Sequence, residues 1–114
     1  MKLDAHVEWA ARAVLDKKAE DVVALDLRKV ASFADYFLIA SAGNVKQLVA
    51  MADSVRDVLR ENGRRPNHVE GYPRQEWILL DYGDFVVHLF TPVTRSFYDL
   101  ERLWGGAVRR ELVG

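Results

Sequence analysis

The sequence predicts one α/β domain in which helices flank a mixed β-sheet, and three observations support this. Helical and strand-like patterns follow each other in the order helix, strand, strand, helix, short strand, strand, strand, helix. The 114 residues fit a single domain, and no linker, repeat or low-complexity stretch divides them. With 50% hydrophobic and 29% charged residues, the chain has enough apolar content to fill a core.

The first part of the chain contains one helix and two strands in this prediction. Apolar residues at helical spacing predict a helix over 3–18, with acidic residues near its start and lysines near its end. Residues 21–27 contain β-branched side chains and alternate in polarity, which predicts a strand, and 28–34 form a short connector. Residues 36–41 are almost continuously apolar, as is typical of a central strand covered on both faces.

A second helix follows a break in the pattern. Asn44 is suited to cap its first turn, an apolar stripe runs along it, and Asn62-Gly63 is typical of a left-handed helix end. Residues 64–75 are rich in turn-forming types, with a short strand expected near 68–70.

Residues 76–81 and 84–90 are expected to form a β-hairpin. A two-residue turn would pair Leu79 with Val86. One face of this hairpin is fully apolar and belongs to the core: Ile78, Leu80, Phe85, Val87 and Leu89. The other face is mixed and is either partly covered or faces a partner: Trp77, Leu79, Asp81, Asp84, Val86 and His88.

The end of the chain is expected to contain one more element. Residues 94–103 predict a short helix, with Phe97 and Leu100 at neighbouring positions. Gly105-Gly106 ends the ordered part in this prediction, so that about residues 105–114 form a flexible tail.

The histidines and paired aspartates give little support for a metal site. His6, His68 and His88 are widely spaced and lack an HExxH pattern, so we expect no metal, and we interpret His88 as a half-buried strand residue. Asp81 and Asp84 flank the predicted turn, where carboxylates often cap backbone groups. Holding a divalent cation is the alternative role for this pair.

The segment from Ser41 to Asn44, between a strand and a helix, has the position of a phosphate-binding turn but not its pattern. It lacks GxGxxG and GxxxxGK[ST], and Ser41 has no histidine and aspartate support for a nucleophile. A nucleotide-binding or nucleotidyl-transferring enzyme is the alternative from another class. Such an enzyme needs an Asp-x-Asp pair after a Gly-Ser turn, whereas the next acidic residue here, Asp53, lies within a helix. We therefore expect no catalytic residue, no cofactor and no enzyme activity.

The charge balance favours a protein partner over a nucleic acid. Sixteen Lys and Arg residues stand against 17 Asp and Glu residues, giving a net charge of -1 and a pI near 6.3. Nucleic-acid-binding domains usually carry a basic excess. The chain has no cysteine and no apolar run of the ~20 residues needed to span a bilayer. We expect a cytoplasmic protein that does not enter a membrane.

Large aromatic side chains are the strongest interface candidates. Trp77, Tyr98 and Trp104 lie on the mixed hairpin face or late in the chain. Asp99 and Glu101 are close to them in sequence, and rings beside carboxylates suit the anchoring of a protein partner.

Several blocks of the sequence are shared with a known family. They are Asp35-Tyr36-Phe37, Glu70-Gly71-Tyr72, WILLDYGD at 77–84, VVHLF at 86–90 and FYDLERLW at 97–104. In these blocks the chain resembles the ribosomal silencing factor family, RsfS, also called Iojap. The match follows the family's order over nearly the whole chain, and the two longest blocks are highly specific.

The resemblance implies an α/β sheet related to nucleotidyltransferases, without their catalytic motif, in a small cytoplasmic protein that often forms a homodimer. It also implies binding to the large ribosomal subunit through ribosomal protein L14. There such a factor blocks joining with the small subunit and represses translation when nutrients are scarce. Organellar relatives serve large-subunit assembly, so an assembly factor is the nearest alternative.

Within the matching blocks we expect eight residues to make the ribosomal contact: Trp77, Asp81, His88, Tyr98, Asp99, Leu100, Glu101 and Trp104. The chain departs from the family pattern twice. Before the second helix the family usually has TGxSxRQ, whereas residues 41–47 are SAGNVKQ, which leaves the role of this loop open. After Trp104 the usual Gly-Asp is Gly105-Gly106, which removes one negative charge from the end of the patch.

Overall fold

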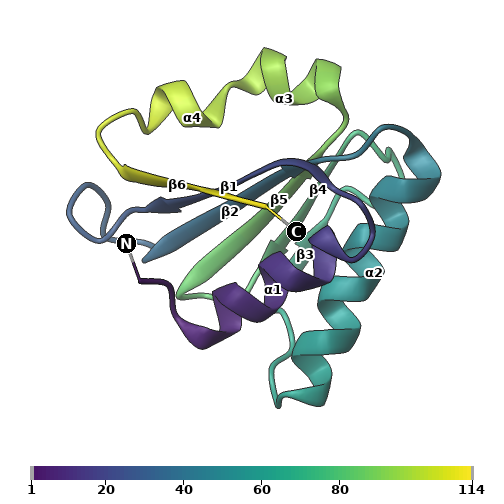
Figure 1. Ribbon diagram of the computed structural model, residues 1–114, viewed down its shortest axis with the longest axis horizontal. Helices are drawn as coiled ribbons and strands as arrows, with labels where there is room; N and C mark the ends of the chain where they lie inside the picture. The colour runs from purple at the N-terminus through teal and green to yellow at the C-terminus, as the bar shows by residue number, and fades with distance from the viewer. Residues whose placement is uncertain (1, 114) are drawn as a thin grey trace.

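The structure is a computed structural model that describes residues 2–113. Its centre is a six-stranded sheet with the strand order β3-β4-β5-β2-β1-β6, and helices lie on both faces (Figure 1). The predicted α/β class with a mixed sheet is therefore confirmed. In chain order the elements are α1 (Ala5–Leu15), β1 (Glu20–Asp26), β2 (Tyr36–Ser41), α2 (Val45–Glu61), β3 (His68–Glu70), β4 (Trp77–Asp81), β5 (Phe85–Phe90), α3 (Pro92–Tyr98), α4 (Leu100–Leu103) and β6 (Val108–Leu112).

Two fully buried strands, β2 and β5, form the centre of the sheet. They run parallel, with Phe37 beside Val86 and Ile39 beside His88, and all other neighbouring strands run antiparallel. Every residue of both strands is buried, which confirms the prediction of a central strand at 36–41. Because a tight turn cannot join parallel neighbours, the chain passes from β2 to β5 through α2, β3 and β4.

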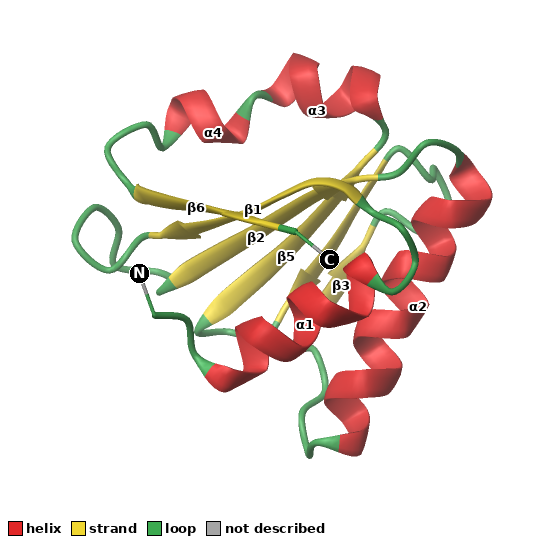
Figure 2. Cartoon of the chain, in the orientation of Figure 1, coloured by secondary structure: helices red, strands yellow, loops and turns green. Residues whose placement is uncertain are grey.

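The two longer helices, α1 and α2, cover one face of the sheet (Figure 2). The Asn44 side-chain oxygen accepts a hydrogen bond from the Gln47 N–H at 2.8 Å, so the predicted cap of α2 is confirmed. No helix among the described residues is long and apolar enough to cross a membrane. The apolar side of the β4–β5 hairpin faces these helices as predicted, and it consists of Ile78, Leu80, Phe85, Val87 and Leu89.

The pairing within the hairpin differs from the predicted register. Asp81 lies opposite Val86 and Leu79 opposite His88, so the two strands are offset by two residues from the pairing that a turn at Tyr82-Gly83 would give. The Tyr82 N–H donates to the Phe85 carbonyl at 2.9 Å, so the turn lies one residue later, at Gly83-Asp84. The Asp81 side chain accepts a hydrogen bond from the Gly83 N–H at 2.8 Å, and Gly83 has a φ of 91°. An offset of two residues leaves each side chain on its expected face.

On the second face of the sheet the helices of the described chain are α3 and α4, and residues of the connector between β1 and β2 also pack there. Instead of the one helix predicted over 94–103, the chain has two short helices separated by Asp99, which adopts a left-handed φ of 48°. Neither helix has a fully buried side chain, although Leu100 and Trp104 pack on the core from this side. This face is therefore only partly covered.

The flexible tail expected at 105–114 is a wrong prediction over 108–112. Residues Val108–Leu112 form β6, an edge strand paired antiparallel with β1. The charged run Arg109-Arg110-Glu111 does not predict a strand from the sequence. Both faces of this edge strand are partly exposed, so its residues do not alternate between apolar and polar. Arg110 also forms an ion pair with Glu8 of α1 at 3.1 Å.

We predict that Gly71→Ala destabilises the fold. Gly71 has a φ of 99°, and a Cβ there would lie 1.8 Å from the Trp77 carbonyl oxygen, so the loop before β4 would have to move. We expect a loss of about 3 kcal/mol in unfolding free energy, measured by urea denaturation. Gly63→Ala is the matched control, because Gly63 has a φ of 82° but no atom within 4 Å of the added Cβ. Its loss should be about 1 kcal/mol, and equal losses in the two variants would contradict the prediction.

Candidate functional site

A cluster of rings lies on the partly covered side of the sheet, and we call it the aromatic face. Neighbouring ring centroids in the cluster are between 4.4 and 6.5 Å apart, within the range at which aromatic pairs attract each other. The rings come from the connector before β2 and from β2, β4, β5, α3 and the end of α4. The members of the aromatic face are Phe33, Phe37, Trp77, His88, Phe90, Tyr98 and Trp104.

Trp77 is hydrogen-bonded to a buried, neutral histidine, His88. The Trp77 indole Nε1 donates a hydrogen bond to His88 Nδ1 at 3.1 Å. His88 is only 4% exposed, and this burial lowers its pKa to about 3, so the ring is neutral near pH 7. The hydrogen bond to Nδ1 places the remaining proton on Nε2, which has no hydrogen-bond partner among the described residues. The interpretation of His88 as a half-buried strand residue is therefore wrong: it is buried, and it orients the Trp77 ring through this hydrogen bond.

Tyr98 stands beside Trp77 at the open side of the cluster. Their ring centroids are 4.5 Å apart, and Tyr98 is 47% exposed whereas Trp77 is half-buried. A small hollow of about 170 Å³ opens next to them, lined also by Gly71, Arg74 and Glu76. Two adjacent rings beside a hollow form a surface that an incoming side chain can fill.

Two exposed rings extend the surface beyond the predicted residues. Phe33 is 57% exposed and lies 5.5 Å from Trp104, ring centre to ring centre. Phe97 is 79% exposed and meets the edge of Tyr98 at 5.1 Å. Sequence patterns do not reveal either residue as part of a surface, because Phe33 lies in a connector and Phe97 has the spacing of a buried helix position.

Leu100 and Trp104 pack against the sheet and are only partly exposed to solvent. Both are half-buried and pack against the apolar side chains of β1, β2 and β5 on this face. Of the eight predicted contact residues, the structure therefore brings Trp77, Tyr98 and Trp104 into one surface, with Leu100 beneath its edge.

The three predicted carboxylates have different surroundings. Asp81 binds the backbone of its own loop, as described above, and Asp84 pairs with Arg64 at 2.7 Å instead of turning toward Asp81. The Asp99 side chain makes no hydrogen bond or ion pair with residues 2–113, and its backbone forms the break between α3 and α4. Across the described chain, no three His, Cys, Asp or Glu side chains gather where they could hold a metal ion.

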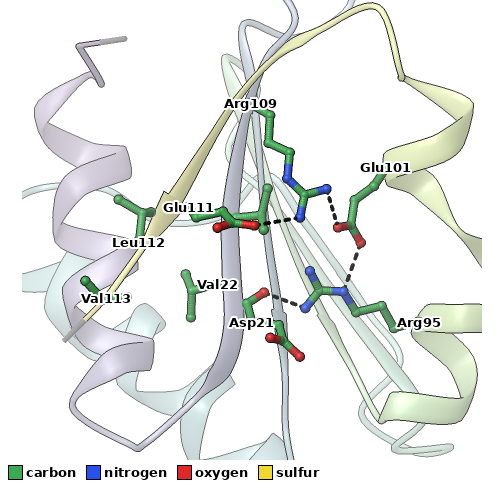
Figure 3. A pocket seen from close by; sticks show the side chains of 9 residues that line it. Asp21, Val22, Arg95, Glu101, Arg109, Glu111, Leu112 and Val113 are labelled. Atoms are coloured by element: carbon green, nitrogen blue, oxygen red, sulfur yellow. Dashed lines mark hydrogen bonds and ion pairs between the residues drawn. The ribbon is translucent and has the colours of Figure 1, made fainter.

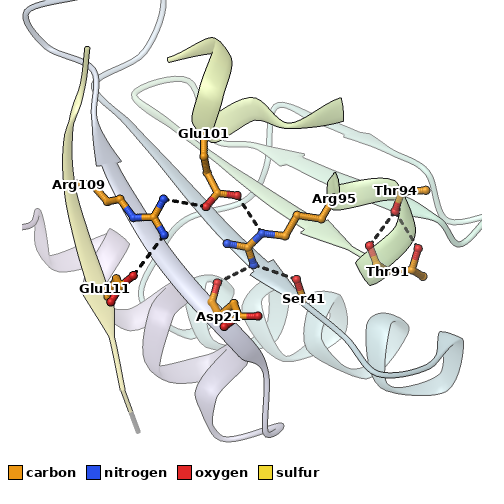
Figure 4. Close-up of polar contacts among 8 residues, drawn as sticks. All are labelled: Asp21, Ser41, Thr91, Thr94, Arg95, Glu101, Arg109 and Glu111. Atoms are coloured by element: carbon orange, nitrogen blue, oxygen red, sulfur yellow. Dashed lines mark hydrogen bonds and ion pairs between the residues drawn. The ribbon is translucent and has the colours of Figure 1, made fainter. Parts of the chain in front are cut away.

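Glu101 is held inside a polar network (Figure 4). Its carboxylate accepts a hydrogen bond from Arg95 Nε at 2.9 Å and another from Arg109 at 3.0 Å. Arg109 also reaches Glu111 of β6 at 3.3 Å. Burial alone would raise the pKa of Glu101, but Arg95 and Arg109 outweigh it, and the pKa lies below its ordinary value. Glu101 therefore remains ionised and serves the fold as an ion-pair partner.

The same network lines a hollow of about 350 Å³ between α3, α4 and the β1–β6 edge (Figure 3). Asp21, Arg95, Glu101, Arg109 and Glu111 surround it, and the arginines and glutamates are already paired with one another. These paired charges attach α3 and α4 to the sheet, whereas the Asp21 carboxylate forms no hydrogen bond or ion pair with residues 2–113.

The segment at 41–47 has a structural role. Ser41 is 3% exposed and its hydroxyl accepts a hydrogen bond from Arg95 at 2.8 Å. The Gln47 side chain accepts from the Gly43 N–H and donates to the carbonyls of Lys17 and Lys18, 2.7 to 2.9 Å away. Side chains of α2 and its cap thus satisfy the N–H groups at the start of the helix, and Gln47 connects it to the turn that follows α1.

We predict that His88 makes the protein acid-sensitive. A histidine with a folded pKa of about 3 and an ordinary value of 6.5 is protonated first in the unfolded chain, so stability falls as the pH drops from 6.5 toward 3. His88→Asn keeps an acceptor for Trp77 but cannot titrate. Below pH 6.5, the unfolding free energy of the unsubstituted protein should fall faster than that of the variant by about 1.4 kcal/mol per pH unit.

The measurement is a series of urea titrations between pH 7 and pH 4.5. His68→Asn, which removes an exposed histidine of β3, controls for the loss of a histidine as such. Parallel pH profiles for His88→Asn and the unsubstituted protein would contradict the prediction.

Comparison with known proteins agrees with this architecture. A family model described as "Ribosomal silencing factor during starvation" matches residues 1–113. The chain is 45% identical over 112 residues to the ribosomal silencing factor RsfS of Bacillus subtilis, covering 98% of this chain and 95% of that protein. It is 44% identical over 108 residues to RsfS of Halalkalibacterium halodurans, covering 95% and 92% of the two chains.

Solved structures give the same result. A crystal structure of a protein from Chromobacterium violaceum superimposes with a TM-score of 0.87 at 36% identity, over 100% of this chain and 95% of that one. The family's sequence blocks supply the strands at the centre of the sheet and most rings of the aromatic face, and the likeness extends over the full length of the fold. The chain belongs to the ribosomal silencing factor family.

Proposed function

We propose that this protein represses translation by binding the large ribosomal subunit through ribosomal protein L14 and blocking its association with the small subunit. The observation that carries the proposal is the aromatic face, where Trp77 and Tyr98 stand side by side and partly exposed in a member of the silencing family. The protein works in the cytoplasm and without a cofactor in this proposal.

The chemistry of the surface supports a protein partner with basic groups. Trp and Tyr are the side chains most often found at the energetic centre of protein interfaces, because they bury a large area at little entropic cost. Asp99 borders the rings with a half-exposed carboxylate, and Glu76 adds an exposed one that lies 3.9 Å from Arg74. Carboxylates around an aromatic centre favour and orient a cationic surface.

The proposed mechanism is steric exclusion and needs no bond to be made or broken. If the factor occupies the face on which the small subunit must dock, the two binding events exclude each other. This is negative linkage, so each ~1.4 kcal/mol of affinity changes the competition tenfold. A homodimer is a further expectation, for which the exposed Val93 and Phe97 leave apolar area; a stable one would bury about 1,200–2,000 Å² in total.

We predict that Tyr98→Ala and Trp77→Ala weaken binding to isolated large subunits. Removing either ring deletes a central anchor, so we expect each dissociation constant to rise by about thirtyfold, equivalent to about 2 kcal/mol. Co-sedimentation over a range of protein concentrations measures the change. Trp9→Ala is the matched control, because Trp9 is a 37% exposed tryptophan on α1, on the other side of the sheet. Unchanged binding by both aromatic-face variants, with their folds intact, would refute this site.

We also predict a direct effect on subunit joining. Light scattering of purified subunits should show fewer joined ribosomes as the protein is added, and Tyr98→Ala should require a correspondingly higher concentration. Ribosome profiles after deletion of the gene separate the two ribosomal roles. Excess joined ribosomes in starved cells would support silencing, whereas accumulated large-subunit precursors would support an assembly factor.

A further inference from the structure

Arg95 fastens α3 and α4 to the sheet. Its Nη1 donates to the Asp21 carbonyl oxygen at 2.6 Å and to Ser41 Oγ at 2.8 Å, while its Nε donates to Glu101 at 2.9 Å (Figure 4). The Arg95 side chain is only 12% exposed. One guanidinium thus joins α3 to β1, to the end of β2 and to α4.

Two irregular points of the backbone make these contacts possible. Asp21 lies in the bulge of β1 with a left-handed φ of 50°, and its carbonyl is the one that Arg95 reaches. On a continuous helix, Arg95 and Glu101 would point about 120° apart, since each residue turns the helix by about 100°. The left-handed Asp99 breaks the helix between them and lets the two side chains meet.

Apolar packing of α3 and α4 is limited to half-buried side chains such as Leu100 and Trp104. Neither α3 nor α4 has a fully buried side chain, and Val93, Phe97 and Leu103 are at least 70% exposed. The polar contacts of Arg95 therefore weigh heavily in the position of both helices. Tyr98 follows Arg95 by one helical turn, and Trp104 lies at the end of α4.

We propose that Arg95 is a positioning residue of the docking surface: it seats α3 and α4 on the sheet and so keeps Tyr98 and Trp104 aligned with Trp77 for the partner. The inference rests on the proposed function, because it assigns Arg95 to the same surface. Only molecules with seated helices are competent to bind, so loosening the helices weakens apparent affinity in proportion to the competent fraction.

The test compares Arg95→Ala and Ser41→Ala with Arg102→Ala. Ser41 is 3% exposed and cannot touch a partner, so its effect on binding must pass through Arg95. Arg102 is an exposed arginine of α4 whose side chain forms no hydrogen bond or ion pair with residues 2–113, which makes it the matched control. Two readouts are needed: amide hydrogen exchange of residues 92–104 in the free protein, and affinity for isolated large subunits.

We expect Arg95→Ala to speed exchange in 92–104 while α1, α2 and the central strands stay protected, and to weaken binding by at least about tenfold. Ser41→Ala should act in the same direction by a smaller factor, and Arg95→Lys should restore part of the loss. The control should change neither readout. If Arg95→Ala disturbs the whole fold, Ser41→Ala and Arg95→Lys carry the test.

The outcomes separate this inference from the proposed function. If the unsubstituted protein does not bind large subunits, the proposed function fails. If it binds, but Arg95→Ala and Ser41→Ala bind equally well or leave exchange in 92–104 unchanged, only the role of Arg95 is overturned.

Discussion

The parallel pairing of β2 with β5 is the constraint on which the candidate site depends. It joins the first half of the chain to the second and sets Phe37 beside Val86 and Ile39 beside His88. Through this pairing Phe37 comes within 4.4 Å of His88, ring centre to ring centre, although the two residues are far apart in sequence. A different register would separate the rings that now form one continuous surface.

The two faces of the sheet are covered to different extents, and the less covered face contains the candidate site. α1 and α2 seal one face with apolar stripes, so that side holds most of the core. On the other face, α3 and α4 are short and are attached by ion pairs and hydrogen bonds. Polar attachment keeps large rings near the surface instead of burying them, and exposed aromatic patches of this kind mark interaction sites.

The neutral His88 shows how a buried polar group can serve this surface. Its Nδ1 accepts the hydrogen bond of the Trp77 indole, which would otherwise leave a half-buried donor without a partner. The His88 ring is neutral in the folded protein, because burial disfavours the protonated form. Trp77 thereby gains a fixed orientation on the aromatic face.

Much of this protein was determined by its sequence alone, because local patterns report local structure. The apolar run at 36–41, the Asn44 cap and the apolar side of the β4–β5 hairpin all appear in the structure as predicted. Periodicity and caps involve neighbours within a few residues, so the sequence contains the whole of their physical cause. The sequence blocks that resemble the silencing family likewise identified its membership.

Tertiary structure decided the features that depend on distant partners. β6 forms only because β1 offers a free edge, and its charged residues gave no sign of a strand. Arg95 joins Glu101 to Asp21 and Ser41, which lie 74 and 54 residues from Arg95 in the sequence, and the break at Asp99 brings Arg95 and Glu101 together. The burial of His88 and the exposure of Phe33 have the same origin. Only the folded chain sets which side chains cover one another, because burial is a property of packing across the sheet and not of position in the sequence.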